Sequence, residues 1–280
     1  MYEAEPRTFG MGKVKFIILI VIVAIIVFLL MELPVVTGRG ANEVKKALAE
    51  TEWVELSGKT LFISDLHLTA EPALEKQFNL DFSNVQNVVI VGDFFHSEED
   101  FWSFGDTEQE VFEKVLSQII PSDFTGKIFY INALTHDPQV LETQELSFGS
   151  STLYLVGRYG KFTVNSFSVV AYHGDQLHGG IIGGGISWLA GKFGFPLPLE
   201  RLGKKRFGID EDTWVMNGHS HVPGIDQQAR VANTGSFVGA PFNKFIFQVH
   251  VGTGILFDGD RVELQEYEGL NLKKLYPFSI

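Results

Sequence analysis

The chain has 280 residues, of which 45% are hydrophobic and 20% charged, and this suits one domain of roughly 220 residues with an N-terminal appendage. It contains no cysteine, so disulfides and thiolate metal sites are excluded, and any bound metal must use nitrogen and oxygen ligands. The formal net charge of −12 disfavours nonspecific binding to long nucleic acids.

The first feature along the chain is an unbroken apolar run from Phe16 to Met31. Residues 14–33 come close to the ~20 residues that a helix needs to cross a bilayer. We therefore expect residues 1–13 to form a tail and residues 14–33 to form a single-pass membrane anchor. The alternative is a cleaved signal peptide, but the sequence has no Ala-x-Ala cleavage site. Basic residues lie on both sides of the run and are nearer on its N-terminal side, which favours an N-terminus inside the cell but leaves the orientation open.

The next elements follow from capping signals and apolar periodicity. Residues 34–56 are expected to form a linker with a short helix from Asn42 to Thr51, capped by Asn42. The folded body is then expected to cover residues 57–280. Apolar runs predict strands at 60–63, 87–91, 127–131, 152–156, 161–164, 167–172, 214–217, 245–251 and 262–267, and helical spacing predicts a helix from Asp106 to Ile120. This order favours an α/β fold with two packed sheets flanked by helices.

Polar clusters that contain six of the eight histidines follow several of these apolar runs. Imidazole and carboxylate are ligands for hard and borderline metal ions, and α/β folds place their chemistry at strand ends. Taken singly, each cluster could be a turn or cap. Taken together they predict a metalloenzyme. The clusters are Asp65-Leu66-His67, Gly92-Asp93-Phe94-Phe95-His96, Thr135-His136-Asp137, His173-Gly174-Asp175 and Gly218-His219-Ser220-His221.

The order of these clusters resembles the calcineurin-like metallophosphoesterase family, with its blocks D-x-H, G-D-x-x-D/H, G-N-H-D/E, H-G-D or G-H, and G-H-x-H. The later segment Asn233-Thr234-Gly235-Ser236 resembles the N-x-G-S turn that follows the last block, and residues 173–177 are similar to the H-G-D-x-L block of the UDP-2,3-diacylglucosamine pyrophosphohydrolase branch. The resemblance implies an α/β/β/α sandwich of two mixed sheets. It also implies hydrolysis of a phosphodiester, phosphomonoester or pyrophosphate by a hydroxide that bridges two metal ions.

The resemblance assigns metal ligands residue by residue. One ion would be held by Asp65, His67, Asp93 and His221, and Asp93 would bridge to a second ion held by His173 and His219. Mn²⁺ suits this mixed set, with Fe or Zn as alternatives. Thr135 stands where the family has a ligating asparagine, so its shorter hydroxyl is a doubtful ligand.

The remaining polar residues of the clusters receive roles around the metals. By resemblance His136 is the general acid that protonates the leaving oxygen, and its neighbour Asp137 could orient it. We expect His96, Asp137 and Asp175 to contact the substrate or to support the ligands. The alternative for His96 is packing beneath Phe94 and Phe95.

Residues 178–207 form a glycine-rich apolar stretch that ends in a basic cluster. We interpret it as a lid or a membrane-facing insertion, and the alternative is a packed loop with a solvated basic end. Together with the anchor it favours a lipid or other phosphate-containing small molecule as substrate, and the bilayer as a partner. Two alternatives to this function remain: a membrane-tethered binding domain without activity, which Thr135 keeps open, and a phosphodiesterase for small nucleotides or nucleic acid.

Overall fold

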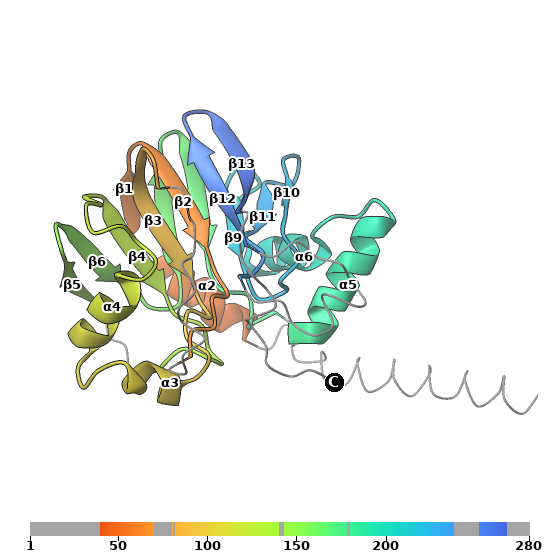
Figure 1. Cartoon of the computed structure of the whole chain (residues 1–280). Coiled ribbons are helices and arrows are strands. Elements are labelled where there is room, and N and C mark those ends of the chain that lie inside the picture. The colour runs from red at the N-terminus through yellow and green to blue at the C-terminus, as the bar shows by residue number, and fades with distance from the viewer. Residues whose placement is uncertain are drawn as a thin grey trace, which may run out of the picture.

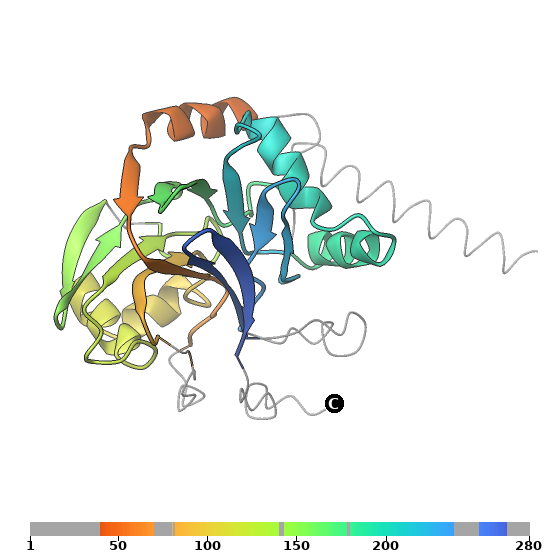
Figure 2. The ribbon, with the colours of Figure 1, turned by 90° about the horizontal axis from the view of Figure 1, so that it is seen from above.

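The protein is described by a computed structural model, and the structure describes residues 40–69, 80, 82–139, 143–177, 180–237 and 252–267. Two mixed β-sheets lie face to face, and helices cover the outer face of each (Figure 1). Figure 2 shows α2 and α6 along one side of the sheets and α3 and α4 along the opposite side. The two-sheet α/β architecture expected from the sequence is therefore confirmed for the described residues.

The larger sheet has seven strands in the order β13-β12-β2-β3-β4-β6-β5. At its centre, β2, β3 and β4 run parallel to one another. Their carboxyl ends therefore lie at the same edge of the sheet. The strands are β2 (Lys59–Ile63), β3 (Val85–Val91), β4 (Lys127–Ile131), β5 (Gln144–Phe148), β6 (Ser151–Leu155), β12 (Thr253–Asp258) and β13 (Arg261–Glu266).

The smaller sheet has six strands in the order β1-β7-β8-β9-β11-β10. Here β8, β9 and β11 run parallel and also end at one edge. The strands are β1 (Trp53–Leu56), β7 (Gly160–Val164), β8 (Phe167–Ala171), β9 (Trp214–Asn217), β10 (Gly224–Asp226) and β11 (Val231–Asn233).

The core lies between the two sheets and beneath the helices on either side. Along β3, Val89 and Val91 belong to the core between the sheets, while Val88 and Ile90 belong to the core beneath the helices. This alternation is what an extended chain gives, because successive side chains point to opposite faces. A strand covered on both faces reads as a continuous apolar run, which is why β2, β3 and β4 could be predicted.

The helices cover the outer faces of the sheets by burying one apolar face each. On the larger sheet, Phe101 of α3 and Phe112 of α4 are buried, and Ser97 and Thr107 cap these helices by accepting backbone N–H bonds. On the smaller sheet, α2 and α6 contribute buried residues to a separate core. The helices are α2 (Ala41–Glu50), α3 (Glu98–Ser103), α4 (Glu108–Leu116), α5 (Gly180–Lys192) and α6 (Pro198–Phe207).

The boundary between linker and folded body differs from the sequence expectation. Gly40, and not Asn42, is the residue before the first turn of α2, and α2 buries Val44 and Leu48 against the smaller sheet. Strand β1 pairs in parallel with β7. Residues 40–56 therefore belong to the body, because the helix and strand bury apolar side chains that a linker would expose.

Other expectations are shifted or lie outside the described residues. The helix predicted at 106–120 is α4, which ends at Leu116, and α3 was not predicted because its six residues are too few for a periodic pattern. Among the described residues no helix is long and apolar enough to cross a membrane. The tail at 1–13, the anchor at 14–33 and the strand at 245–251 lie outside the described residues.

Candidate metal centre and active site

The polar clusters meet because parallel strands of both sheets end at the same place. Asp65 follows β2, Asp93 follows β3 and His136 follows β4, all in the larger sheet. From the smaller sheet, His173 follows β8, and the segment with His219 and His221 follows β9. The carboxyl ends of the two packed sheets thus build one site from five loops, as ligand sites in open α/β sheets commonly are.

A first group of candidate metal ligands consists of Asp65, His67 and His221, whose ligand atoms all lie within 4.8 Å of one another. His221 Nε2 lies 3.0 Å from Asp65 Oδ1. His67 Nε2 lies 3.9 Å from the same oxygen. One carboxylate and two imidazoles converge here, a set that suits a divalent cation.

A second group consists of Asp93, His173 and His219, which are all buried and meet the same 4.8 Å limit. His173 Nε2 lies 3.1 Å from Asp93 Oδ2 and 3.2 Å from His219 Nδ1. Asp93 Oδ2 is also 3.6 Å from His67 Nε2 of the first group. One carboxylate oxygen therefore lies between the two groups.

Five of these six residues have left-handed backbone conformations. The φ angles are 55° at Asp65, 46° at His67, 47° at Asp93, and 56° at both His219 and His221. Such conformations are disfavoured for residues with a side chain and cost on the order of 1–3 kcal/mol each. They persist at the strand ends, where they turn the ligand side chains together, and strain of this kind concentrates at functional sites.

Two glycines let the loops approach one another. Gly92 has φ 73°, and a Cβ there would lie 2.7 Å from the ring of His173. A Cβ at Gly218 would collide with Ser64 Oγ and Asp65 Oδ2. The loop after β3 can therefore lie against the loop after β8 only because Gly92 has no side chain. In the same way, the loop after β9 can lie against the loop after β2 only because Gly218 has none.

Hydrogen bonds between loops hold the ligands in register. His219 N donates to both carboxylate oxygens of Asp65, at 3.2 and 3.1 Å, so that a bond crosses from one sheet to the other. Asp65 N donates to Gly92 O (3.1 Å) and His67 N donates to Asp93 O (3.0 Å). Ser236 Oγ, in the turn after β11, donates to Asp65 O at 3.1 Å.

Burial and the mutual effect of charges shift the pKa values of the buried carboxylates and imidazoles of the site. Burial acts to raise the pKa of Asp65 and of Asp93, but the neighbouring histidines, His173 foremost, together outweigh it, so both pKa values lie below their usual range. Burial lowers the pKa of His67 to about 3 and also lowers the pKa of His219. Burial opposes charge on His173 too, yet Asp93 and Asp65 raise its pKa well above the usual value.

The donor set fits a bound cation. His67 Nδ1, His67 Nε2 and Asp93 Oδ1 are buried, and none has a hydrogen-bond partner in the described part of the chain. Buried polar atoms without partners are rare in proteins and call for an explanation such as an ion. Two carboxylates and four imidazoles supply only the nitrogen and oxygen ligands that a cysteine-free chain can offer.

His136 lies beside the first group of ligands. Its ring centroid is 4.9 Å from that of His67, and its Nδ1 is 2.7 Å from the backbone oxygen of His96. A carbonyl can only accept, so Nδ1 of His136 donates this bond and Nε2 is left for exchange with a substrate. His96 is exposed and its ring stacks against that of His136 at 5.6 Å, so it is not packed beneath its two phenylalanine neighbours.

Asp137 does not orient His136. Its Oδ1 accepts from Phe94 N (3.0 Å) and Phe95 N (3.2 Å), and its Oδ2 accepts from Ala133 N (2.8 Å). Burial and the nearby Asp93 raise the pKa of Asp137 to about 7. At 3% exposure it supports the loop that carries Asp93, and His96 O orients His136 instead.

Thr135 and Asp175 take different positions around the second group. Thr135 is exposed. Asp175 Oδ2 accepts from Leu134 N at 2.5 Å, which links the loop after β4 to the loop after β8. The charge of Asp175 adds to the effect of Asp93 and Asp65 that raises the pKa of His173, and it partly opposes the burial that lowers the pKa of His219.

The structure adds one residue that the sequence did not indicate. Glu200 of α6 is fully buried, and its Oε1 accepts from Asn233 Nδ2 (2.7 Å) and Ser220 Oγ (3.3 Å). Asn233 Nδ2 is also 2.6 Å from Gly218 O. Because Ser220 stands between His219 and His221, Glu200 braces the loop that carries both ligands. In sequence it reads as an ordinary acidic residue in the first turn of a helix.

Comparison with known proteins gives a coarse result. No family model matches the sequence, and no curated protein matches it. Among solved structures, a predicted phosphoesterase from Streptococcus pneumoniae is 13% identical, with 76% of this chain and 94% of that chain covered and a TM-score of 0.36. The phosphoesterase YfcE of Escherichia coli is 18% identical, with 76% and 95% covered and a TM-score of 0.41. Vps29 of Entamoeba histolytica, complexed with zinc, is 12% identical, with 74% and 97% covered and a TM-score of 0.38. Similarity at this level does not assign the chain to a family, so the function has to be inferred from the site.

Proposed function

We propose that the protein is a metal-dependent phosphoesterase that hydrolyses a phosphodiester, phosphomonoester or pyrophosphate at a centre of two divalent cations. The observation that carries the proposal is the pair of three-residue ligand groups with one oxygen of Asp93 between them. A single structural cation would need one such group. Two groups that share a carboxylate suit a reaction in which two ions contact one phosphoryl group.

In this proposal each candidate ligand binds one cation or both. Asp65, His67 and His221 would hold one cation, His173 and His219 the other, and Asp93 would contact both. Bound cations would neutralise charge on the phosphoryl oxygens and lower the pKa of the attacking water. Mn²⁺ suits this nitrogen and oxygen set, and Fe and Zn are alternatives.

His136 supplies the proton in this proposal. The bond from its Nδ1 to His96 O keeps the ring oriented. Because Nδ1 keeps its own proton in this bond, the ring acts in its doubly protonated form, in which Nε2 gives the second proton to the leaving oxygen as the ester bond breaks. His96 is exposed next to it, where it contacts the bound ester. Thr135 is exposed on the same loop and is at most a weak ligand, so water would complete the second ion's coordination.

The decisive experiment measures turnover of bis-p-nitrophenyl phosphate and p-nitrophenyl phosphate with added Mn²⁺, Zn²⁺ or Fe²⁺. Asp93→Asn should abolish turnover and lower the metal content, because it removes a charge from both groups. Asp260→Asn, at an exposed position between β12 and β13, is the matched control and should retain both. Metal binding by the wild type without turnover of either ester would favour the non-catalytic binding domain, and turnover confined to cyclic nucleotides would favour the nucleotide phosphodiesterase.

A second observation supports an amphiphilic substrate and a location at the membrane. Leu189, Phe193 and Phe195, at the end of α5 and just after it, are 51%, 74% and 68% exposed, and Figure 1 shows α5 at the outer side of the molecule. We refer to these three residues as the α5 tip. An exposed apolar group of this kind can enter an acyl layer, and the expected anchor at residues 14–33 would keep it there.

The basic cluster contributes less to this contact than the sequence indicated. Lys204 Nζ donates to Glu211 O and Ala229 O, both at 2.8 Å, and Arg201 is paired with Asp226. Both side chains are thus bound to backbone carbonyls or to a carboxylate of the same chain. The lipid contact that we propose is therefore mainly apolar.

The lipid proposal predicts a selective effect of the α5 tip. In Phe193→Ser/Phe195→Ser, kcat/KM should fall for a lipid-linked phosphate ester and stay unchanged for its deacylated head group. Trp102→Ser removes an aromatic residue of α3 that is 39% exposed, and it should change kcat/KM for neither substrate. Equal rates for the two substrates in the wild type would remove the lipid hypothesis.

A further inference from the structure

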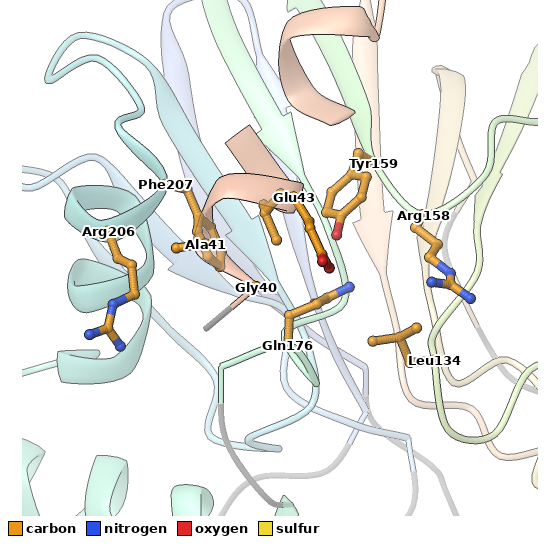
Figure 3. A pocket seen from close by; sticks show the side chains of 10 residues that line it. Gly40, Ala41, Glu43, Leu134, Arg158, Tyr159, Gln176, Arg206 and Phe207 are labelled. Atoms are coloured by element: carbon orange, nitrogen blue, oxygen red, sulfur yellow. The ribbon is translucent and has the colours of Figure 1, made fainter. Parts of the chain in front are cut away.

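A pocket lies close to the loops of the candidate metal centre. It has a volume of about 230 Å³ and is lined by the start of α2, the loops after β4, β6 and β8, and the end of α6. Its polar lining comes from Glu43, Arg158, Tyr159, Gln176 and Arg206 (Figure 3). This is smaller than a typical pocket for a whole drug-sized ligand, so it accommodates one ring-sized part of a substrate.

The pocket shares two loops with the metal centre. Leu134, which lines it, is two residues before His136, and Gln176, which also lines it, is three residues after His173. Asp175 ties these loops together by accepting from Leu134 N. An ester whose phosphate reaches the ligand groups therefore has this pocket as a neighbour.

The polar groups of the pocket form a set of mixed donors and acceptors. Figure 3 shows the Glu43 carboxylate, the Tyr159 hydroxyl and the Gln176 amide nitrogen pointing toward one another. The carboxylate accepts, the amide nitrogen donates and the hydroxyl does both. Gln176 Nε2 is buried and makes no hydrogen bond of good geometry among the described residues, and its interaction with the Tyr159 hydroxyl leaves it the capacity for a further bond. A buried donor that is not fully satisfied is a site that a ligand can complete.

The charges of the lining decide which ligand class fits. The lining holds two guanidinium groups, those of Arg158 and Arg206, and one carboxylate, that of Glu43. Figure 3 shows the Arg206 guanidinium directed away from Glu43, Tyr159 and Gln176. A second phosphate placed among those three groups would therefore meet the carboxylate of Glu43, and like charges at close range are unfavourable. Arg158 Nη2 is already engaged with Gln139 Oε1, at 2.5 Å. The apolar side chains of Val44, Leu134 and Phe207 complete the lining. An uncharged group that carries several hydroxyls can use the acceptor, the donor and the apolar wall at the same time.

We propose that this pocket binds the alcohol part of the phosphate ester, and that this part is an uncharged polyhydroxyl group such as a sugar. The proposal rests on the phosphoesterase function and specifies its substrate. Glu43 and Tyr159 are specificity-determining residues in it, while the hydrolytic step itself involves neither.

The test compares two p-nitrophenyl phosphodiesters with the same leaving group, one of glucose esterified at O6 and one of ethanol. The wild type should show the higher kcat/KM for the glucose ester. Glu43→Gln and Tyr159→Phe should each lower kcat/KM for the glucose ester by about tenfold or more, since the first replaces a charged acceptor by a weaker neutral one and the second removes a hydrogen bond to the substrate. Neither should change the rate with the ethyl ester or with bis-p-nitrophenyl phosphate. Glu50→Gln, at the far end of α2, and Tyr154→Phe, on β6, are the matched controls.

The outcomes separate this proposal from the function on which it rests. Turnover of bis-p-nitrophenyl phosphate without preference for the glucose ester would overturn the pocket assignment and leave the phosphoesterase intact. If no ester is turned over, the binding of glucose 6-phosphate and of ethyl phosphate to the full chain with Mn²⁺, measured by calorimetry, decides the matter. Tighter binding of the sugar phosphate that Tyr159→Phe abolishes would support the pocket, and equal binding would overturn it.

Discussion

Glu200 offers a sharp test of how α6 supports the metal centre. Its carboxylate is buried without a cation beside it, and Oε2 has no hydrogen-bond partner among the described residues. We compare Glu200→Ala, which removes the acceptor, with Glu200→Gln, which keeps an acceptor oxygen at nearly the same place and removes the charge. Comparing the two variants separates the contribution of the hydrogen bonds of Glu200 to stability from the cost of burying its charge.

The magnitude follows from the contacts. Oε1 accepts two hydrogen bonds, and bonds to a charged group contribute about 1.5–3 kcal/mol each to stability. The burial of an unpaired carboxylate offsets part of this, and Asn233 keeps its bond to Gly218 O. We therefore expect Glu200→Ala to lower the free energy of unfolding by about 2–3 kcal/mol and to weaken metal binding. At about pH 5, Glu200→Gln should leave both close to the wild type.

The comparison also has a pH dependence. Burial raises the pKa of Glu200 in the folded state, so the folded chain holds this proton more tightly than the unfolded chain does. The stabilising contribution of protonation is fully present below the unfolded pKa and is lost as pH rises through the folded pKa. Glutamine does not titrate, so Glu200→Gln should gain stability relative to the wild type between about pH 5 and about pH 8.

The assay is urea denaturation of the metal-free full chain at both pH values, followed by calorimetric titration with Mn²⁺. Equal loss of stability in the alanine and glutamine variants would refute the reasoning, because it would mean that the charge, and not the accepted hydrogen bonds, holds the ligand loop. A Glu200→Ala variant with unchanged metal affinity would refute the reasoning as well.

Three further predictions follow from the same structure. His136→Ala should lower kcat by ~10²–10⁴-fold with the metal content unchanged, as measured by metal analysis alongside steady-state rates; loss of both metals would instead make His136 a ligand. Gly92→Ala should abolish metal binding in calorimetry, since the new Cβ meets the His173 ring at a left-handed φ. The control Gly191→Ala should bind metal normally, because a Cβ there meets nothing within 4 Å. Removal of residues 1–33 should leave a folded, metal-binding protein by circular dichroism and calorimetry, whereas removal of residues 1–56 should not, because it deletes α2 and β1.

The central strands and the positions of the ligand residues could be predicted because both depend on short sequence patterns. A strand buried on both faces must be apolar throughout, and its end must be polar if chemistry occurs there. Asp65, Asp93 and His173 each stand directly after such a run. Parallel pairing then brings the ends together without further information from the sequence.

The supporting residues could not be predicted, because their roles depend on contacts between distant segments. Asp137 stands next to His136 in sequence, yet its carboxylate turns to the backbone of Phe94 and Phe95. Glu200 meets Asn233 and Ser220 only after α6 has packed on the smaller sheet. The start of α2 was misplaced for a simpler reason, since Gly40 precedes it without a side-chain cap.

The origin of the ligand loops in two different sheets has a consequence for how the fold is held together. A cation bound by Asp65 and His221 would join the end of β2 to the end of β9, and a cation bound by Asp93 and His173 would join β3 to β8. In a chain without cysteine, these would be the cross-links between the sheets that a disulfide supplies in other proteins. Their strength varies with the surroundings, because a ligand that binds only the folded state adds about 2.7 kcal/mol of stability when its free concentration is about 100 times its Kd. The substrate would thus be held at the same edge of the two sheets as these cations. The free metal concentration would therefore determine how strongly the two sheets are held together at the place where the reaction occurs.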